Sequence, residues 1–259
     1  MADFTYTLIS EQDRLPSIGL LALQADETIE SELRQWIAPG QADLYVSRVP
    51  SGLEVTPDSL REMEGEITAA ASLFPRTITL DVVAYGCTSA SAILGPDRVA
   101  ELARQGCACR HVTEPVSALV WTCRSRNIRR LAFLSPYIES VSTPLRDVLG
   151  KEGIETPVFG SFNEAEEARV ARIDPSSIAT AASALAELGG VDAIFISCTN
   201  LKALNILPQI EAATGLPAFS SNSVLAEHVR ELAGLADRNY KRFFTKARPD
   251  PDFRYFSNA

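Results

Sequence analysis

Two short segments of the chain share a pattern that ends in a cysteine. Residues 81–89 read DVVAYGCTS and residues 192–200 read DAIFISCTN, so each has Asp, five mostly apolar residues, Cys-Thr and a small polar residue. The cysteines, Cys87 and Cys198, could form an acid/base pair in which one thiolate takes a proton while the other thiol gives one. Alternatively, one thiolate could add to a carbon–carbon double bond conjugated to carboxylates. Neither reaction needs a cofactor.

The residues after each cysteine could bind a carboxylate. Each motif lies where an apolar strand is expected to end and a helix to begin, and ligands of open parallel sheets bind beyond the carboxyl ends of the strands. The free N–H groups of a helix start favour a thiolate and also bind anions. We therefore expect both cysteines to ionise readily. The side chains expected to hold a substrate carboxylate are those of Thr88, Ser89, Thr199 and Asn200.

A more ordinary explanation is that such cysteines belong to the core, because cysteine is among the most buried residue types. We prefer that explanation for Cys107, Cys109 and Cys123, which lie in no comparable motif. The repeated context of Cys87 and Cys198 favours a function instead. No metal site is predicted, because Cys107-x-Cys109 has no second Cys/His pair at zinc spacing and the chain has only 2 histidines.

Short apolar segments alternate with amphipathic ones along the chain, which predicts parallel sheets covered by helices on both faces. The expected strands are Ile18–Leu23, Leu44–Val49, Asp81–Tyr85, Arg110–Thr113, Arg130–Leu134, Thr156–Phe159, Asp192–Ile196 and Ala218–Ser220. The expected helices are Glu27–Trp36, Pro57–Leu73, Ala90–Gln105, Pro115–Ser125, Ser142–Lys151, Pro175–Leu188, Leu201–Thr214 and Ser223–Ala233.

The order of these elements repeats, as the cysteine motifs do. We expect an α/β fold of two similar, doubly wound parallel-sheet halves related by pseudo-twofold symmetry, with the site between them. Residues 1–126 would form the half that carries Cys87, residues 127–234 the half that carries Cys198, and residues 235–259 a tail. An offset of 111 residues would also align Asp26 with Tyr137, both at the end of a first strand.

Composition excludes several classes of protein. Net charge is −9, so nucleic acid and anionic membranes are poor partners. No apolar stretch is long enough to span a membrane, and the N-terminus lacks the pattern of a secretory signal, so we expect a cytoplasmic protein. The dinucleotide, P-loop, serine-hydrolase and zinc-protease motifs are absent from the sequence. No cofactor is therefore predicted.

The motifs together resemble the aspartate/glutamate racemase superfamily, in its maleate isomerase and arylmalonate decarboxylase branch. The segments that carry this resemblance are YGCTSAS at 85–91, SCTNL at 197–201, SPY at 135–137, SRVP at 47–50 with EVTP at 54–57, and SSN at 220–222. The resemblance covers residues 17–234. It implies that Tyr137 contacts a substrate carboxylate and that the protein is a homodimer.

One segment departs from the maleate isomerase pattern. The pattern of maleate isomerases includes a loop of the Pro-Ser-Ser-Asn-Thr type after the first strand. This chain has LQADETIE at 23–30 instead, with Asp26 in place of the asparagine. That segment is more similar to the ectoine-utilisation A proteins. Asp26 would repel a dicarboxylate and attract an amino group, although it could also simply begin a solvated helix.

We therefore predict a cofactor-independent racemase or cis–trans isomerase of a small carboxylate or amino-acid derivative. Cys87 would be the nucleophile or first base, and Cys198 its acid/base partner. An arylmalonate-type decarboxylase is a weaker alternative, because the resemblance implies that decarboxylases of this branch keep only the second-half cysteine and have Gly at the first position, whereas this chain has both cysteines. A carboxylate-binding protein without catalysis is the alternative from another class.

Overall fold

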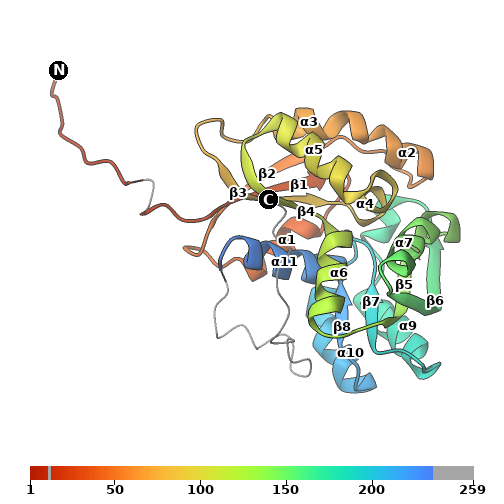
Figure 1. Ribbon diagram of the computed structural model, residues 1–259. Coiled ribbons are helices and arrows are strands. Elements are labelled where there is room, and N and C mark those ends of the chain that lie inside the picture. The colour runs from red at the N-terminus through yellow and green to blue at the C-terminus, as the bar shows by residue number, and fades with distance from the viewer. Residues whose placement is uncertain (11–12, 236–259) are drawn as a thin grey trace.

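Two four-stranded parallel sheets form the centre of the molecule in a computed structural model that describes residues 1–10 and 13–235 (Figure 1). The first sheet has the order β2-β1-β3-β4 and the second β6-β5-β7-β8. The strands of the first are β1 (Ser17–Leu23), β2 (Asp43–Val49), β3 (Leu80–Gly86) and β4 (Cys109–Thr113). Those of the second are β5 (Arg130–Tyr137), β6 (Glu155–Glu164), β7 (Ala193–Ile196) and β8 (Ala218–Ser220). The fold class is therefore confirmed.

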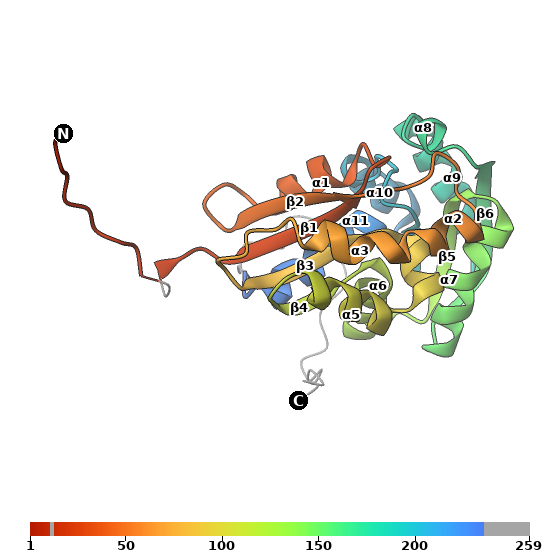
Figure 2. The same ribbon diagram turned by 90° about the horizontal axis from the view of Figure 1, so that it is seen from above.

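Helices cover both faces of each sheet. Those of the first half are α1 (Ile29–Trp36), α2 (Pro57–Glu62), α3 (Glu64–Ala71), α4 (Thr88–Leu94), α5 (Pro96–Gly106) and α6 (Pro115–Ser125). Those of the second half are α7 (Glu139–Lys151), α8 (Glu167–Val170), α9 (Pro175–Glu187), the 3₁₀ turn Leu204–Ile206, α10 (Leu207–Thr214) and α11 (Ser221–Leu232). Helices α3 and α5 lie on one side of the first sheet (Figure 2).

The two halves exchange their last helices. Helix α11, which follows β8, packs against β3, β4 and α1 of the first half. Helix α6, which follows β4, packs along α11. The Arg126 guanidinium just after α6 lies 5.0 Å from the ring centre of Phe219 in β8. Packing of α11 and α6 thus joins the two halves. The predicted domain boundary at residue 126 stays a prediction. The tail at 235–259 falls, after Leu235, outside the described residues.

The central strands have the apolar composition that burial on both faces requires. Every residue of β1 is buried, and every residue of β5 after Arg130. Among the described residues, no helix is long and apolar enough to cross a membrane. The homodimer implied by the resemblance remains a prediction.

Three helices predicted as continuous are interrupted. Gly95 has φ +86° and Pro96 begins α5, so the expected helix at 90–105 is divided, because proline lacks the N–H that a continuing helix needs. The expected helix at 57–73 divides at Met63. The one expected from Leu201 begins at the 3₁₀ turn instead, so no helix directly follows the second cysteine motif.

The repeat is real, but its alignment differs by two residues in the first strands. Leu20 pairs with Ala84, and Phe133 pairs with Phe195. Because 195 − 84 = 111 while 133 − 20 = 113, the offset changes from one strand to the next. The predicted equivalence of Asp26 and Tyr137 is therefore wrong. A shift of two preserves which side chains face which side of the sheet, so the apolar pattern could not reveal it.

Candidate active site

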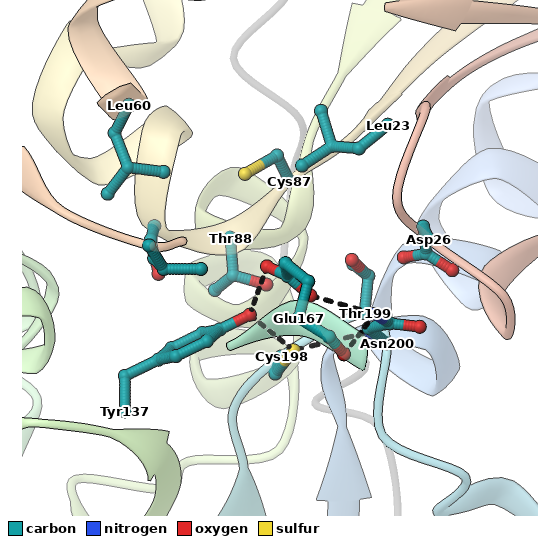
Figure 3. A pocket seen from close by; sticks show the side chains of 12 residues that line it. Leu23, Asp26, Leu60, Cys87, Thr88, Tyr137, Glu167, Cys198, Thr199 and Asn200 are labelled. Carbon is teal, nitrogen blue, oxygen red and sulfur yellow. Dashed lines mark hydrogen bonds between the residues drawn. The ribbon is translucent and has the colours of Figure 1, made fainter. Parts of the chain in front are cut away.

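One enclosed cavity between the halves brings together all eight predicted site residues (Figure 3). They are Asp26, Cys87, Thr88, Ser89, Tyr137, Cys198, Thr199 and Asn200. Leu23, Val55, Leu60 and Glu167 complete its wall. Cys87 and Cys198 project toward the cavity from opposite sides, Cys87 above and Cys198 below in Figure 3. Both thiols thus line the same small cavity.

Cys87 lies between the end of β3 and the start of α4. It is the N-cap residue of that helix, and its sulfur accepts a hydrogen bond from the Ala90 N–H at 3.4 Å. Burial nevertheless raises the pKa of the thiol to about 12, because the N–H groups of Ala90 and Ser89 offset only part of the desolvation. The expectation that a helix start makes this cysteine ionise readily is therefore wrong.

Cys198 follows β7 in a different backbone conformation. Its φ is +123°, a value that residues other than glycine rarely adopt, so the turn holds this cysteine in a strained backbone conformation. The sulfur accepts from the Asn200 N–H at 3.3 Å and lies 3.1 Å from the Tyr137 hydroxyl. Burial and the nearby Glu167 carboxylate raise the pKa of the thiol well above its usual range. Easy ionisation is thus wrong here too.

Asp26 has two roles that the sequence offered as alternatives. Its Oδ1 atom accepts hydrogen bonds from the N–H groups of Thr28 and Ile29, both at 2.8 Å, which fixes the start of α1. The same side chain is 5% exposed and lines the cavity. Burial raises its pKa, and the two N–H groups counteract that rise.

Glu167 lines the cavity, and the sequence analysis missed it. Its Oε1 accepts from the Tyr137 hydroxyl at 2.8 Å, and its Oε2 accepts from Asn200 Nδ2 at 2.7 Å. Burial raises the pKa of this carboxyl, and the hydrogen bonds from Asn200 and Tyr137 oppose the rise. Only the acidic segment EAEEAR at 164–169 surrounds it in the sequence, which is typical of a solvated turn.

Backbone pairing between the halves holds Glu167 in place. Glu167 N–H donates to Leu53 O at 3.0 Å, and Val55 N–H donates to Ala165 O at 2.9 Å. Glu54 and Glu166 form an antiparallel bridge between these bonds. The segment after β2 is thereby tied to the segment after β6, and both line the cavity, through Val55 and Glu167. Neither half alone contains this arrangement, so no local pattern could predict it.

Polar side chains join the two motifs across the site. Ser221 Oγ accepts both from the Cys198 N–H at 3.0 Å and from Thr88 Oγ1 at 2.8 Å. Thr199 Oγ1 donates to Gly86 O at 3.3 Å. The sequence placed Ser221 in a matching motif but gave it no role.

Asn200 and Tyr137 are largely engaged by the protein itself. Asn200 Oδ1 accepts from the Glu27 N–H at 2.9 Å, while its Nδ2 donates to Glu167. The Tyr137 hydroxyl lies between Glu167 and Cys198. Thr88 and Thr199 also donate their hydroxyl protons within the protein, which leaves the Ser89 hydroxyl as the better placed donor to a substrate carboxylate.

The wall of this cavity carries acidic groups and no basic side chain: none of the 12 lining residues is Lys, Arg or His. Arg48 lies behind it, with Nη1 donating to the carbonyl oxygens of Leu23 at 2.9 Å and Asp26 at 2.7 Å. In the described part of the chain, no group of three or more His, Cys, Asp or Glu side chains could hold a metal ion. The chemistry available is that of two thiols, two carboxyls and a phenol.

The sequence profile described as arylmalonate decarboxylase matches residues 49–241. The chain belongs to this family. A maleate isomerase from Pseudomonas putida is 24% identical over 222 residues, which cover 80% of this chain and 88% of the relative. A maleate isomerase from Geobacillus stearothermophilus is 23% identical over 218 residues, covering 79% and 86%.

Solved structures of the family share the fold. The maleate isomerase from Pseudomonas putida S16 superimposes with a TM-score of 0.73 at 21% identity, covering 84% of this chain and 92% of that one. Unliganded arylmalonate decarboxylase gives a TM-score of 0.68 at 23% identity, covering 91% and 96%. The family matches confirm the predicted maleate isomerase and arylmalonate decarboxylase branch. The closer relation to ectoine-utilisation A proteins stays a prediction.

Proposed function

We propose that the protein is a cofactor-independent isomerase of a small carboxylate, and that Cys87 and Cys198 act as a pair on opposite faces of the substrate. The observation that carries this proposal is the placement of both thiols on opposite sides of one enclosed cavity. The family relatives named maleate isomerase support an isomerase. A cysteine-to-serine variant of the Nocardia farcinica enzyme holds a covalently bound succinylcysteine intermediate, so one cysteine of that relative is a nucleophile.

The acidic wall favours transfer of a proton at the α-carbon of an amino-acid derivative. A thiolate on one face takes the α-proton, and the thiol on the other face delivers its own proton, which inverts the centre. The number of protons is unchanged, and the negative charge moves from one sulfur to the other. Ser89 would bind the carboxylate, on which charge accumulates as the proton leaves, and Thr88 and Thr199 would join it by turning their hydroxyls away from Ser221 Oγ and Gly86 O.

We further propose that the substrate carries an amino group. Asp26 and Glu167 line the cavity, and no basic side chain does, so a dicarboxylate would meet repulsion without compensation. An ammonium group beside Asp26 would pair with its carboxylate instead. This agrees with the likeness of residues 23–30 to ectoine-utilisation A proteins, whose presumed substrates are amino acids derived from ectoine or hydroxyectoine.

A cis–trans isomerisation is the second candidate, favoured by the maleate isomerase relatives. In it, a thiolate of Cys87 adds to the double bond, the bond between the carbons rotates, and the thiolate leaves again. Decarboxylation is a weaker possibility, since it needs only one proton donor and this chain has two thiols.

Proton NMR in D₂O separates these reactions. The enzyme is incubated with maleate, aspartate, an arylmalonate, and acetylated or hydroxylated diaminobutyrates. We expect deuterium at the α-carbon of an amino-acid derivative, and we expect Asp26→Asn to weaken that activity while tolerating maleate better. Conversion of maleate to fumarate without deuterium would establish the second candidate. Loss of carbon dioxide from the arylmalonate, or no reaction with any compound, would contradict the proposal.

A further inference from the structure

Glu167 faces a cysteine through a tyrosine, in an arrangement suited to moving a proton. We propose that Glu167 takes the proton of Cys198 by way of the Tyr137 hydroxyl, so that Cys198 becomes a thiolate without releasing a proton to solvent. This inference rests on the proposed function, and it assigns to Glu167 a task that the cysteine pair cannot perform alone.

The contacts form one continuous chain. Cys198 Sγ lies 3.1 Å from the Tyr137 hydroxyl, which lies 2.8 Å from Glu167 Oε1 (Figure 3). Since Tyr137 donates to the carboxylate, the Cys198 thiol is left to donate to the phenol oxygen. Asn200 fixes both ends, because its N–H meets the sulfur and its Nδ2 meets Glu167 Oε2 at 2.7 Å.

The transfer conserves protons and charge. The S–H bond of Cys198 breaks as its proton reaches Tyr137 Oη, and the Tyr137 proton moves to Glu167 Oε1. The phenol is regenerated, the carboxyl becomes neutral, and the single negative charge moves from Glu167 to Cys198. Nothing is oxidised or reduced.

Burial makes this path preferable to loss of the proton to water. Cys198 is 4% exposed and Glu167 6% exposed, so a second negative charge beside an ionised Glu167 is disfavoured. The other titratable groups facing them are Asp26 and Cys87, which would add negative charge, and no basic side chain lines the cavity. Passing the proton to Glu167 keeps the total negative charge in the cavity unchanged at every stage.

The proton relay depends on the backbone pairing between the halves, because this pairing positions Glu167. Glu167 follows directly on the bridge between Glu54 and Glu166, so its carboxylate reaches Tyr137 only while that pairing is formed. Cys87 interacts with the hydroxyl of Tyr85, but no carboxylate of the described residues accepts a hydrogen bond from that hydroxyl, so Cys87 lacks the same proton path.

The test measures how fast iodoacetamide alkylates each cysteine between about pH 6 and 9, with peptide mass spectrometry to separate them. Turnover of the accepted substrate is measured in parallel: activity of the wild type tests the proposed function, and the ratio of variant to wild type tests the relay. Because the Glu167 carboxylate raises the pKa of Cys198, Glu167→Gln should leave alkylation of Cys198 unchanged or make it faster, whereas loss of the proton acceptor should slow turnover about tenfold or more. Alkylation of Cys87 should change little.

The exposed neighbour provides a matched control, since Glu166→Gln removes a charge one residue away and should leave both rates unchanged. Tyr137→Phe should also slow turnover, because it interrupts the relay. Wild-type turnover in a folded Glu167→Gln protein would overturn the proposal. Slower alkylation of Cys198 together with slower turnover would overturn it as well, because that combination indicates a disturbed site and not a missing proton acceptor.

Discussion

The two cysteine turns begin from the same sequence pattern and end in different environments. Cys87 caps a helix in extended backbone and accepts one N–H bond. Cys198 stands at φ +123°, is followed by a turn and a 3₁₀ segment, and contacts a phenol that is bonded to a carboxylate. A duplicated motif therefore places two equivalent atoms at one cavity, while the surrounding segments decide how each one exchanges protons.

The backbone pairing between the halves explains why Cys198, and not Cys87, contacts a tyrosine that is hydrogen-bonded to a carboxylate. Glu167 belongs to a short helix after β6, and the segment before it pairs with the segment after β2. In the first half, the segment after β2 leads into α2 and supplies Val55 and Leu60 to the cavity. The segment after β2 thus gives apolar side chains to the cavity, whereas the segment after β6 gives a carboxyl.

Replacing each cysteine should have the largest effect on activity. Cys87→Ser and Cys198→Ser should each reduce isomerisation by about a thousandfold or more, because a hydroxyl is a far weaker acid and nucleophile than a thiol. The circular dichroism spectrum should stay unchanged. Cys123→Ser, at a buried cysteine outside the cavity, is the control for activity. Full activity in either site variant would contradict the paired mechanism.

The glycine before Cys87 should be needed for close packing of its turn. A Cβ at Gly86 would lie 2.5 Å from Ile29 Cδ1 and 3.3 Å from Leu21 O, so Gly86→Ala should lower the free energy of unfolding by about 2–3 kcal/mol. Gly65→Ala in α3 meets nothing within 4 Å and should be neutral or slightly stabilising. Urea denaturation measures both, and equal stability of the two variants would refute the packing argument.

A buried glutamate should make the contact between the halves pH-dependent. Glu32 accepts from the Leu204 N–H at 3.0 Å and from Asn222 Nδ2 at 2.8 Å, and burial raises its pKa from 4.5 to about 7. A carboxyl with a raised pKa binds more protons when folded, so stability falls as pH rises from about 4.5 to 7. The loss from Glu32 is on the order of 2–3 kcal/mol and is complete above pH 7.

Chemical denaturation at several pH values checks this sign. Glu32→Gln should reduce the fall in stability over that interval, although other buried carboxyls with raised pKa contribute in the same direction. Those carboxyls are Asp26, Glu114, Glu167 and Glu227. An identical pH slope in wild type and variant would show that Glu32 keeps an ordinary pKa.

The smallest expected change concerns the serine that links the two turns. Ser221→Ala removes the acceptor of the Cys198 N–H and of the Thr88 hydroxyl, and should cost about 1–2 kcal/mol of stability. Ser177→Ala, on the exposed side of α9, is the control. Thermal unfolding compares them, and a Ser221→Ala protein as stable as the control would show that this link is unimportant.

The sequence predicted the eight strands and a set of residues that the structure brings together at one cavity, because both depend on local patterns. Ala218–Ser220 was predicted with its observed bounds, and Cys87 and Cys198 were found from their repeated motif. Apolar runs identify strands buried on both faces, and the ends of parallel strands define the binding edge.

What could not be predicted depends on contacts between distant segments. Glu167 reaches the cavity because residues 53–55 and 165–167 pair, and the raised pKa values of the thiols follow from burial that no motif records. His228 of α11 is likewise buried, with Nδ1 2.8 Å from Thr113 Oγ1 of β4, because α11 packs against strands of the first half.

The most direct test of paired cysteines is hydrogen exchange in the single variants. Each enantiomer of the amino-acid derivative that turns over is incubated in D₂O with Cys87→Ser or Cys198→Ser, and α-deuterium is followed by proton NMR. If the thiols serve opposite faces, each variant still exchanges one enantiomer, the two variants prefer opposite enantiomers, and neither racemises at the wild-type rate. Exchange of the same enantiomer by both variants would contradict the account.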